Sequence, residues 1–172
     1  MPNTYKVISS VTVGSGGAAN IEFTSIPQTY TDLKIVFSAR MTNSTNVVDD
    51  VVISINSSTS NFTMKRLFGS GSGTPFSDTG GSNYNWISQS PNAGATTNTF
   101  GNAEIYIPNY TSSANKSISA DSVSENNGTT AYAFLGAVLW SNTAAITSIS
   151  LGGFASNFAQ YSTAYLYGIS NA

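Results

Sequence analysis

The sequence is organised in short stretches in which apolar and polar side chains alternate. In LKIVFSAR, residues 33–40, Leu33, Ile35 and Phe37 fall on one side, while Lys34 and Arg40 fall on the other. This is the period of a β-strand, whose side chains point alternately to its two faces. The preceding segment SIPQTY contains Pro27, which has no N–H to donate to a sheet. We therefore expect an extended lead-in, then a strand with Lys34 and Arg40 on its outward face.

Comparable stretches recur throughout the chain, at residues 5–13, 19–23, 51–56, 62–68, 84–87, 103–107, 117–123, 131–140, 146–151 and 163–169. Clusters of Gly, Ser, Asn and Pro separate them, as is typical of turns. GSGG at 14–17 lies between the first two of these stretches and predicts a β-hairpin. No window keeps the apolar spacing of an amphipathic helix for three turns, so essentially no helix is expected.

About 8–10 short strands predict an all-β fold, an antiparallel β-sandwich, because a single sheet of that size would leave one face wet. A jelly-roll-like arrangement is preferred since it limits exposed edges. An immunoglobulin-like sandwich is the second choice, without support from a cysteine pattern. The length suits one domain over residues 1–172. The expected inner face includes Leu33, Ile35, Phe37, Val51, Ile53, Ile55, Ile105 and Ile107.

The sequence contains neither cysteine nor histidine. Their absence removes thiolate chemistry, the usual imidazole metal ligand and a Ser-His-Asp triad. Asp49 and Asp50 could act as calcium ligands or as half of a glycosidase carboxylate pair. An exposed turn with charges that discourage edge pairing is the favoured interpretation. We predict that the chain is not an enzyme and uses no cofactor and no metal.

Charged residues make up only 8% of the chain, and the net charge is -2. Such a composition does not provide the clustered Lys and Arg residues with which proteins bind nucleic acid. No stretch approaches the length of a membrane span, and the N-terminus lacks the apolar region of a signal peptide. We expect synthesis in a cytoplasm without secretion by a signal peptide, and neither nucleic acid nor membrane as a partner.

A long irregular stretch at residues 69–86, followed by another at 89–99, contains the large aromatic residues Phe76, Tyr84 and Trp86. Long loops in compact domains are commonly functional, and aromatic side chains suit protein interfaces or sugar stacking. These residues are the predicted partner contacts. Lys65 and Arg66 are adjacent in a predicted strand and must point to opposite faces, so only one of them can be a plain solvated charge. The other is expected at an edge, a strand end or a subunit contact, which indicates association.

Specific strings carry a resemblance to a known family: IPQTYTDLKIVFSAR (26–40), FGNAEIYIPNYTS (100–112), NTAAITSISL (142–151) and STAYLYGI (162–169). In this order they resemble small virion structural proteins of tailed bacteriophages, common among cyanophages and environmental phage genomes. The resemblance extends from about residue 4 to the C-terminus. It implies a particle component without catalysis, either a capsid decoration (cement) protein that stabilises the shell or a tail-fibre, receptor-binding component.

The resemblance also implies partners and a location. The chain is expected in the virion, as a homo-oligomer that family analogy makes a trimer, bound to the major capsid protein or another virion protein. Host surface glycans enter only under the tail-fibre alternative. The decoration role is favoured over the tail role because the sequence shows neither the heptads nor the collagen-like repeats of a fibre shaft. A carbohydrate-binding accessory module of an enzyme ranks third.

Overall fold

The computed structural model describes residues 4–71, 73–80, 85–128 and 130–170, and within these ranges it contains strands and no helix. The strands are β1 (Tyr5–Thr12), β2 (Asn20–Phe23), β3 (Asp32–Ala39), β4 (Val48–Ile55), β5 (Phe62–Gly69), β6 (Phe76–Thr79), β7 (Trp86–Pro91), β8 (Gly101–Ile107), β9 (Lys116–Val123), β10 (Ala133–Trp140), β11 (Ile149–Gly153) and β12 (Thr163–Ile169). These twelve described strands exceed the expected number.

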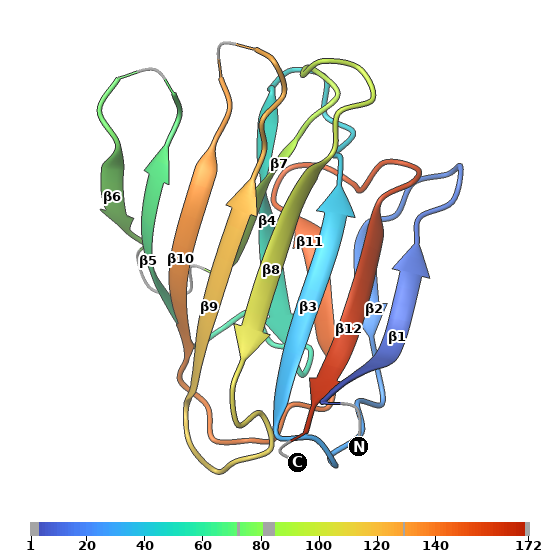
Figure 1. The fold of residues 1–172 in the computed structure, drawn as a ribbon, viewed down its shortest axis with the longest axis vertical. Helices are drawn as coiled ribbons and strands as arrows, with labels where there is room; N and C mark the ends of the chain where they lie inside the picture. Colours follow the sequence, from blue (N-terminus) through green and yellow to red (C-terminus); the bar gives the residue numbers. More distant parts are fainter. Residues whose placement is uncertain (1–3, 72, 81–84, 129, 171–172) are drawn as a thin grey trace.

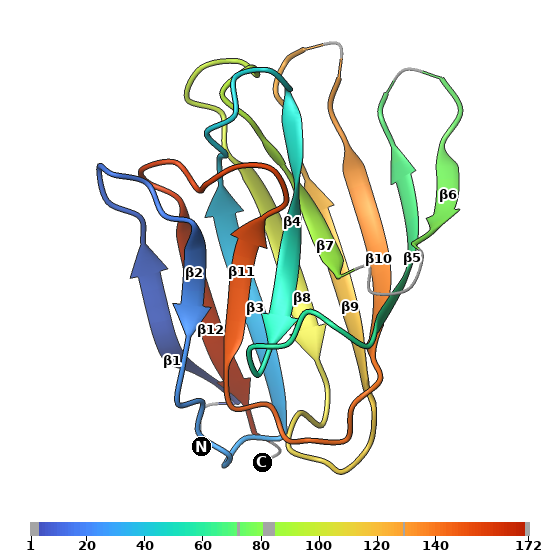
Figure 2. The same cartoon turned by 180° about the vertical axis from the view of Figure 1, so that it is seen from behind.

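The strands form two antiparallel layers. The larger sheet has eight strands in the order β1-β12-β3-β8-β9-β10-β5-β6, and the smaller has four in the order β2-β11-β4-β7. Figure 1 shows the larger sheet in front, and Figure 2 shows the smaller sheet from the other side. The predicted all-β sandwich is confirmed.

The connectivity is that of a jelly roll. β1 pairs with β12 and β3 with β8 in one sheet, while β2 pairs with β11 and β4 with β7 in the other. The chain thus behaves as a long two-stranded ribbon that folds over itself and places consecutive strands in opposite sheets. β5, β6, β9 and β10 are additions that widen the larger sheet beyond β8.

The predicted hairpin at GSGG is wrong, because β1 and β2 belong to different sheets. The turn instead carries the chain across the sandwich. Gly17 has a φ of 69°, and a Cβ there would lie 2.8 Å from the carbonyl oxygen of Phe158. The next residue, Ala18, donates its N–H to that same oxygen at 3.0 Å. The glycines therefore permit a close backbone approach between distant segments.

The prediction that residues 69–86 and 89–99 are irregular is also partly wrong, since the first stretch contains strand β6 and the second contains the end of strand β7. β6 lies inside the first and pairs with β5. Its side chains are all exposed because it is the last strand of the larger sheet, so no apolar alternation marks it in the sequence. β7 begins at Trp86 and runs on to Pro91, inside the second stretch.

Arg40, expected as a solvated outward charge, organises the rest of the second stretch. Its guanidinium donates to the carbonyl oxygens of Ala93, Ala95, Thr96 and Thr99 at 2.8–3.3 Å. A fixed fork of donors suits such a cluster of backbone acceptors. The lead-in around Pro27 lies outside the sheets as predicted. It is anchored by the Tyr110 hydroxyl, which donates to the Pro27 carbonyl.

The core lies between the two sheets and confirms the predicted inner face. All of the residues expected there are buried: Leu33, Ile35, Phe37, Val51, Ile53, Ile55, Ile105 and Ile107. On the opposite face of β3, Lys34 is half-buried and forms an ion pair with Glu104 at 2.7 Å. The apolar alternation therefore correctly assigned the two faces of β3, β4 and β8.

Replacing Phe37 with alanine should lower the free energy of unfolding by about 3–5 kcal/mol, because the variant loses a buried aromatic ring and leaves a cavity. Urea denaturation of the purified chain measures this loss. Val36→Ala, on the outward face of the same strand, is the control and should cost much less. A loss below about 1 kcal/mol for Phe37→Ala would contradict its place in the core.

Candidate functional site

The residues predicted as partner contacts are not in a loop where the structure describes them. Phe76 is the first residue of the edge strand β6 and is 49% exposed. Trp86 is the first residue of β7 and is half-buried against the core. Tyr84 lies outside the described residues. The prediction that these side chains bind a partner stays a prediction.

Arg66 connects Phe76 and Trp86 through one cluster. Its guanidinium carbon lies 4.6 Å from the ring centroid of Phe68 and 4.8 Å from that of Trp86. Phe76 packs on the other aromatic ring, Phe68, which is its cross-strand partner. Cation–π contacts of this kind stabilise a charge in a partly desolvated position. Arg66 is thus the inward-facing member of the Lys65–Arg66 pair and is held by contacts within its own chain.

Two carboxylates balance the charge of Arg66. Asp78 on β6 accepts a hydrogen bond from Arg66 Nη2 at 3.0 Å, and an Asp50 oxygen lies 3.6 Å from Arg66 Nη1. We refer to Asp50, Arg66, Phe68, Phe76, Asp78 and Trp86 as the Arg66 cluster. It lies where β5 and β6 extend past β7, the edge strand of the smaller sheet (Figure 2).

Asp49 and Asp50 are not the exposed turn charges expected from the sequence, since both lie within β4. Asp49 is buried and accepts a hydrogen bond from the Ser156 hydroxyl at 2.6 Å. Burial raises the pKa of Asp50, and its hydrogen bond from Gln89 and the charge of Arg66 oppose that rise. Both carboxylates therefore connect elements of this chain to one another.

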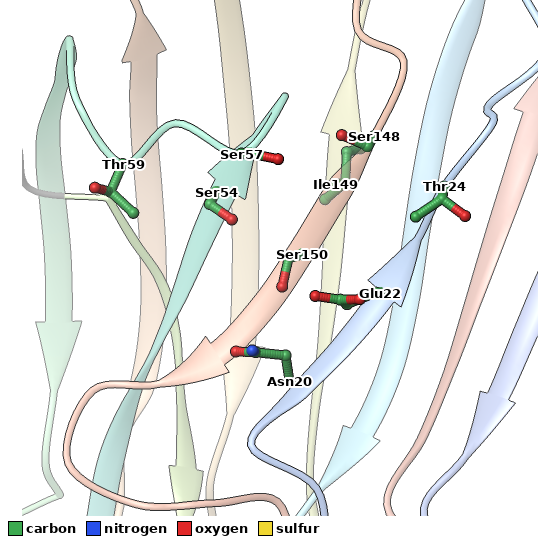
Figure 3. Close-up of a pocket in the computed structure, with 9 residues that line it drawn as sticks. All are labelled: Asn20, Glu22, Thr24, Ser54, Ser57, Thr59, Ser148, Ile149 and Ser150. Carbon is green, nitrogen blue, oxygen red and sulfur yellow. The ribbon is translucent and has the colours of Figure 1, made fainter.

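A polar groove runs across the outer face of the smaller sheet, with a volume of about 440 Å³. Figure 3 shows its walls, which come from β2, β11, β4 and the turns beside them. The lining residues are Asn20, Glu22, Thr24, Ser54, Ser57, Thr59, Ser148, Ile149 and Ser150. Their register brings Glu22, Ser150 and Ser54 into one cross-strand row. The groove is therefore a hydrogen-bonding surface on a sheet floor.

An aromatic pair lies beside this groove. The next cross-strand row contains Asn20, Gly152, Val52 and Trp86. The ring of Phe154, just after β11, meets the Trp86 ring edge to face, with centroids 5.5 Å apart. Phe154 is 63% exposed. Trp86, which the sequence singled out, thus belongs both to the Arg66 cluster and to the border of the groove.

The outer face of the larger sheet carries an apolar patch. β10 is apolar on both faces, and its outward side chains are Ala133, Leu135, Ala137 and Leu139. Leu67 on β5 and Val123 on β9 are the cross-strand neighbours of Leu135 and Ala133. Leu135, Leu67 and Val123 are 57%, 51% and 43% exposed. We call these six side chains the outer apolar patch.

Neither a metal centre nor a membrane helix emerges from the described residues. Within them, no group of three or more acidic, His or Cys side chains could hold a metal ion. No helix in the same ranges has the length and hydrophobicity needed to cross a bilayer. The surface features considered for function are the groove with its aromatic border, the Arg66 cluster and the outer apolar patch.

The sequence matches no protein-family model and no curated protein. Solved structures with some similarity include the Ruminococcus gnavus IT-sialidase CBM40 bound to α2,3-sialyllactose, with 11% identity over 96% of this chain and 90% of that one and a TM-score of 0.33. A leech intramolecular trans-sialidase has 10% identity over 98% of this chain and 26% of its own, with a TM-score of 0.32. The infectious bursal disease virus VP2 subviral particle has 13% identity over 96% of this chain and 41% of that one, with a TM-score of 0.20. Similarities this weak indicate no function for this chain.

Asp50 should make the stability of the protein depend on pH. Its pKa in the folded chain is raised above the ordinary value of 3.8, so the folded state holds the proton more tightly than the unfolded state. The stability that Asp50 contributes through this proton is fully present below pH 3.8, the ordinary pKa. It is lost as pH rises from there through the higher pKa of the folded state. In chemical denaturation across pH, the wild type should lose stability relative to Asp50→Asn as pH rises. Parallel pH profiles for the two proteins would contradict this prediction.

Proposed function

We propose that the chain is a non-enzymatic virion structural protein that acts as a capsid decoration protein. The sequence strings that resemble phage virion proteins supply the class of function. The outer apolar patch is the observation that carries the proposal, because it offers a surface for binding another protein.

The outward face of an antiparallel sheet is normally polar, and a strand that is apolar on both faces is typical of one covered on both sides. β10 has this character, and its neighbours Leu67 and Val123 extend the apolar surface onto β5 and β9. Contiguous exposed apolar patches on soluble proteins commonly mark interaction sites. Removing this patch from water would drive binding through the hydrophobic effect.

A shell is a suitable partner for a surface of this kind. Only 8% of the residues are charged, so long-range electrostatic steering toward a dilute partner would be weak. A capsid instead presents many equivalent sites at high local density. A protein that binds only the assembled shell stabilises it by mass action. A decoration protein therefore needs apolar contact area, and it does not need reactive side chains.

The alternative is a tail component that recognises host surface glycans. The two roles differ in position on the particle, and the number of copies per particle distinguishes them. Decoration requires a copy number set by the shell lattice, whereas a tail part follows the low-order symmetry of the tail. Quantitative mass spectrometry of particles made from the genome that encodes this chain would supply that number.

The double variant Leu67→Asp, Leu135→Lys should lose attachment to the shell, because two charged groups would have to be desolvated in the interface. Both side chains are more than half exposed, and the new lysine would lie between the new aspartate and Asp121, its cross-strand partners, so the melting temperature should stay close to that of the wild type. Co-sedimentation of the purified chain with undecorated particles measures attachment.

Val7→Asp serves as the matched control, because Val7 is 51% exposed but lies on β1 at the far edge of the same sheet. It should bind the shell like the wild type. Attachment that survives the double variant, or that Val7→Asp abolishes equally, would exclude the outer apolar patch as the docking surface.

The expected homo-oligomer, a trimer, also stays a prediction. Closed cyclic assemblies are the usual form of repeated subunits, and virion parts must match the symmetry axes of the particle. Sedimentation equilibrium on the purified chain should give the mass of three 18.0 kDa chains. If only monomer is found at high micromolar concentration, the chain does not form a trimer by itself, and any self-association would depend on the particle.

A further inference from the structure

We propose that the polar groove and its aromatic border form a binding site for an uncharged saccharide. The groove lies on the outer face of the smaller sheet, whereas the outer apolar patch lies on the outer face of the larger sheet. The sandwich core separates the two surfaces, so both can be occupied at once. The saccharide site does not depend on the proposed decoration role.

The groove has the size and chemistry of a small-ligand site. Its volume of about 440 Å³ lies within the range of small-molecule sites. Hydroxyl, amide and carboxylate groups from separate strands converge on it (Figure 3). Ser and Thr hydroxyls both donate and accept hydrogen bonds, as do the hydroxyls of a sugar. A ring with several hydroxyls can therefore find partners along the groove without a charged group of its own.

Gly152 lets its neighbours close over the sheet between the groove and its aromatic border, and it is itself buried. A Cβ at this position would lie 2.9 Å from Asn20 Oδ1 and 3.6 Å from Val52 Cγ2. Its φ lies outside the left-handed region, so the backbone conformation does not require glycine. The side chains of Asn20 and Val52 therefore form the surface in the row that leads from Asn20 to Trp86. A saccharide in the groove would reach the aromatic border across these two side chains.

The aromatic border supplies the apolar half of sugar recognition. A pyranose has a C–H face that can be buried against an aromatic ring while its hydroxyls reach polar groups. Phe154 and Trp86 meet edge to face, and the Phe154 ring is 63% exposed. The guanidinium carbon of Arg66 lies 4.8 Å from the Trp86 ring centroid, and this contact holds the ring in place. A pre-positioned ring lowers the entropy cost of binding.

The charge of the groove selects against acidic sugars. Of its nine lining residues, Glu22 alone has an acidic or basic side chain. Its carboxylate accepts hydrogen bonds from sugar hydroxyls, and such charge-assisted bonds are strong. The same charge repels a sugar carboxylate or sulfate, and Arg66 beyond the border is already paired with Asp50 and Asp78. The ligand class is therefore a neutral oligosaccharide.

The purified full chain would be applied to an array of neutral oligosaccharides that end in glucose, galactose, mannose or N-acetylglucosamine. The α2,3-sialylated forms of the galactose-terminated probes would be on the same array. We expect binding to at least one neutral probe and weaker binding to sialylated counterparts. Failure to bind any neutral probe, or a preference for the sialylated forms, would overturn the proposal.

Variants then test the site with the neutral probe that binds most tightly, by titration calorimetry. Phe154→Ala should weaken binding about ten-fold through loss of the stacking surface. Its ring is mostly exposed, so the fold should persist, and the melting temperature verifies this. Tyr165→Ala removes an exposed ring from the larger sheet and should leave the affinity unchanged. Equal affinities for Phe154→Ala and the wild type would place the saccharide elsewhere.

Glu22→Gln tests the selectivity separately. The amide keeps hydrogen-bonding groups in the groove but removes the negative charge. The affinity ratio of the neutral probe to its sialylated counterpart should therefore fall several-fold. An unchanged ratio would show that Glu22 does not face the bound sugar. A wild-type chain that binds a neutral sugar but does not attach to undecorated particles would overturn the decoration role alone, so the two proposals fail independently.

Discussion

The structure depends on the burial of two apolar sheet faces against each other. Phe37 from the larger sheet and Ile53 from the smaller sheet are among the side chains buried completely or almost completely in the shared core. A strand can contribute only one of its faces to this core, because its side chains alternate. Consecutive strands such as β3 and β4 satisfy this requirement from opposite sheets. Binding surfaces must then be built from outward faces, edges and turns.

The sheets have unequal widths, and this difference determines where charge can be buried. The larger sheet continues through β5 and β6 beyond β7, the edge of the smaller sheet. On the inner face of β5, Arg66 follows Met64 in the alternation and occupies the place of another core residue. Aromatic rings on either side and the carboxylates of Asp50 and Asp78 offset the cost of its burial. A polar cluster thus closes the end of an apolar core.

The two outward surfaces have opposite chemistry. The larger sheet presents apolar side chains around Leu135, whereas the smaller presents hydroxyls, amides and Glu22. Apolar surface favours contact with a protein, and convergent polar groups beside an exposed ring favour a small hydroxylated ligand. A molecule of this shape can adhere through one face while the other remains open to solvent. The cysteine-free and histidine-free composition is compatible with both kinds of contact.

The sequence by itself determined the fold class and the inward faces of individual strands, because alternation is a local property that Leu33, Ile35 and Phe37 display within a few residues. It also singled out Trp86, together with Phe76 and Tyr84, as a predicted partner contact. The tertiary structure decided which strands are neighbours, because pairing depends on contacts between residues far apart in the chain. For this reason GSGG was wrongly predicted to form a hairpin, and the exposed edge strand β6 was missed. Phe154 joins Trp86, and Glu22 joins Ser54 and Ser150, only when the ribbon folds over itself.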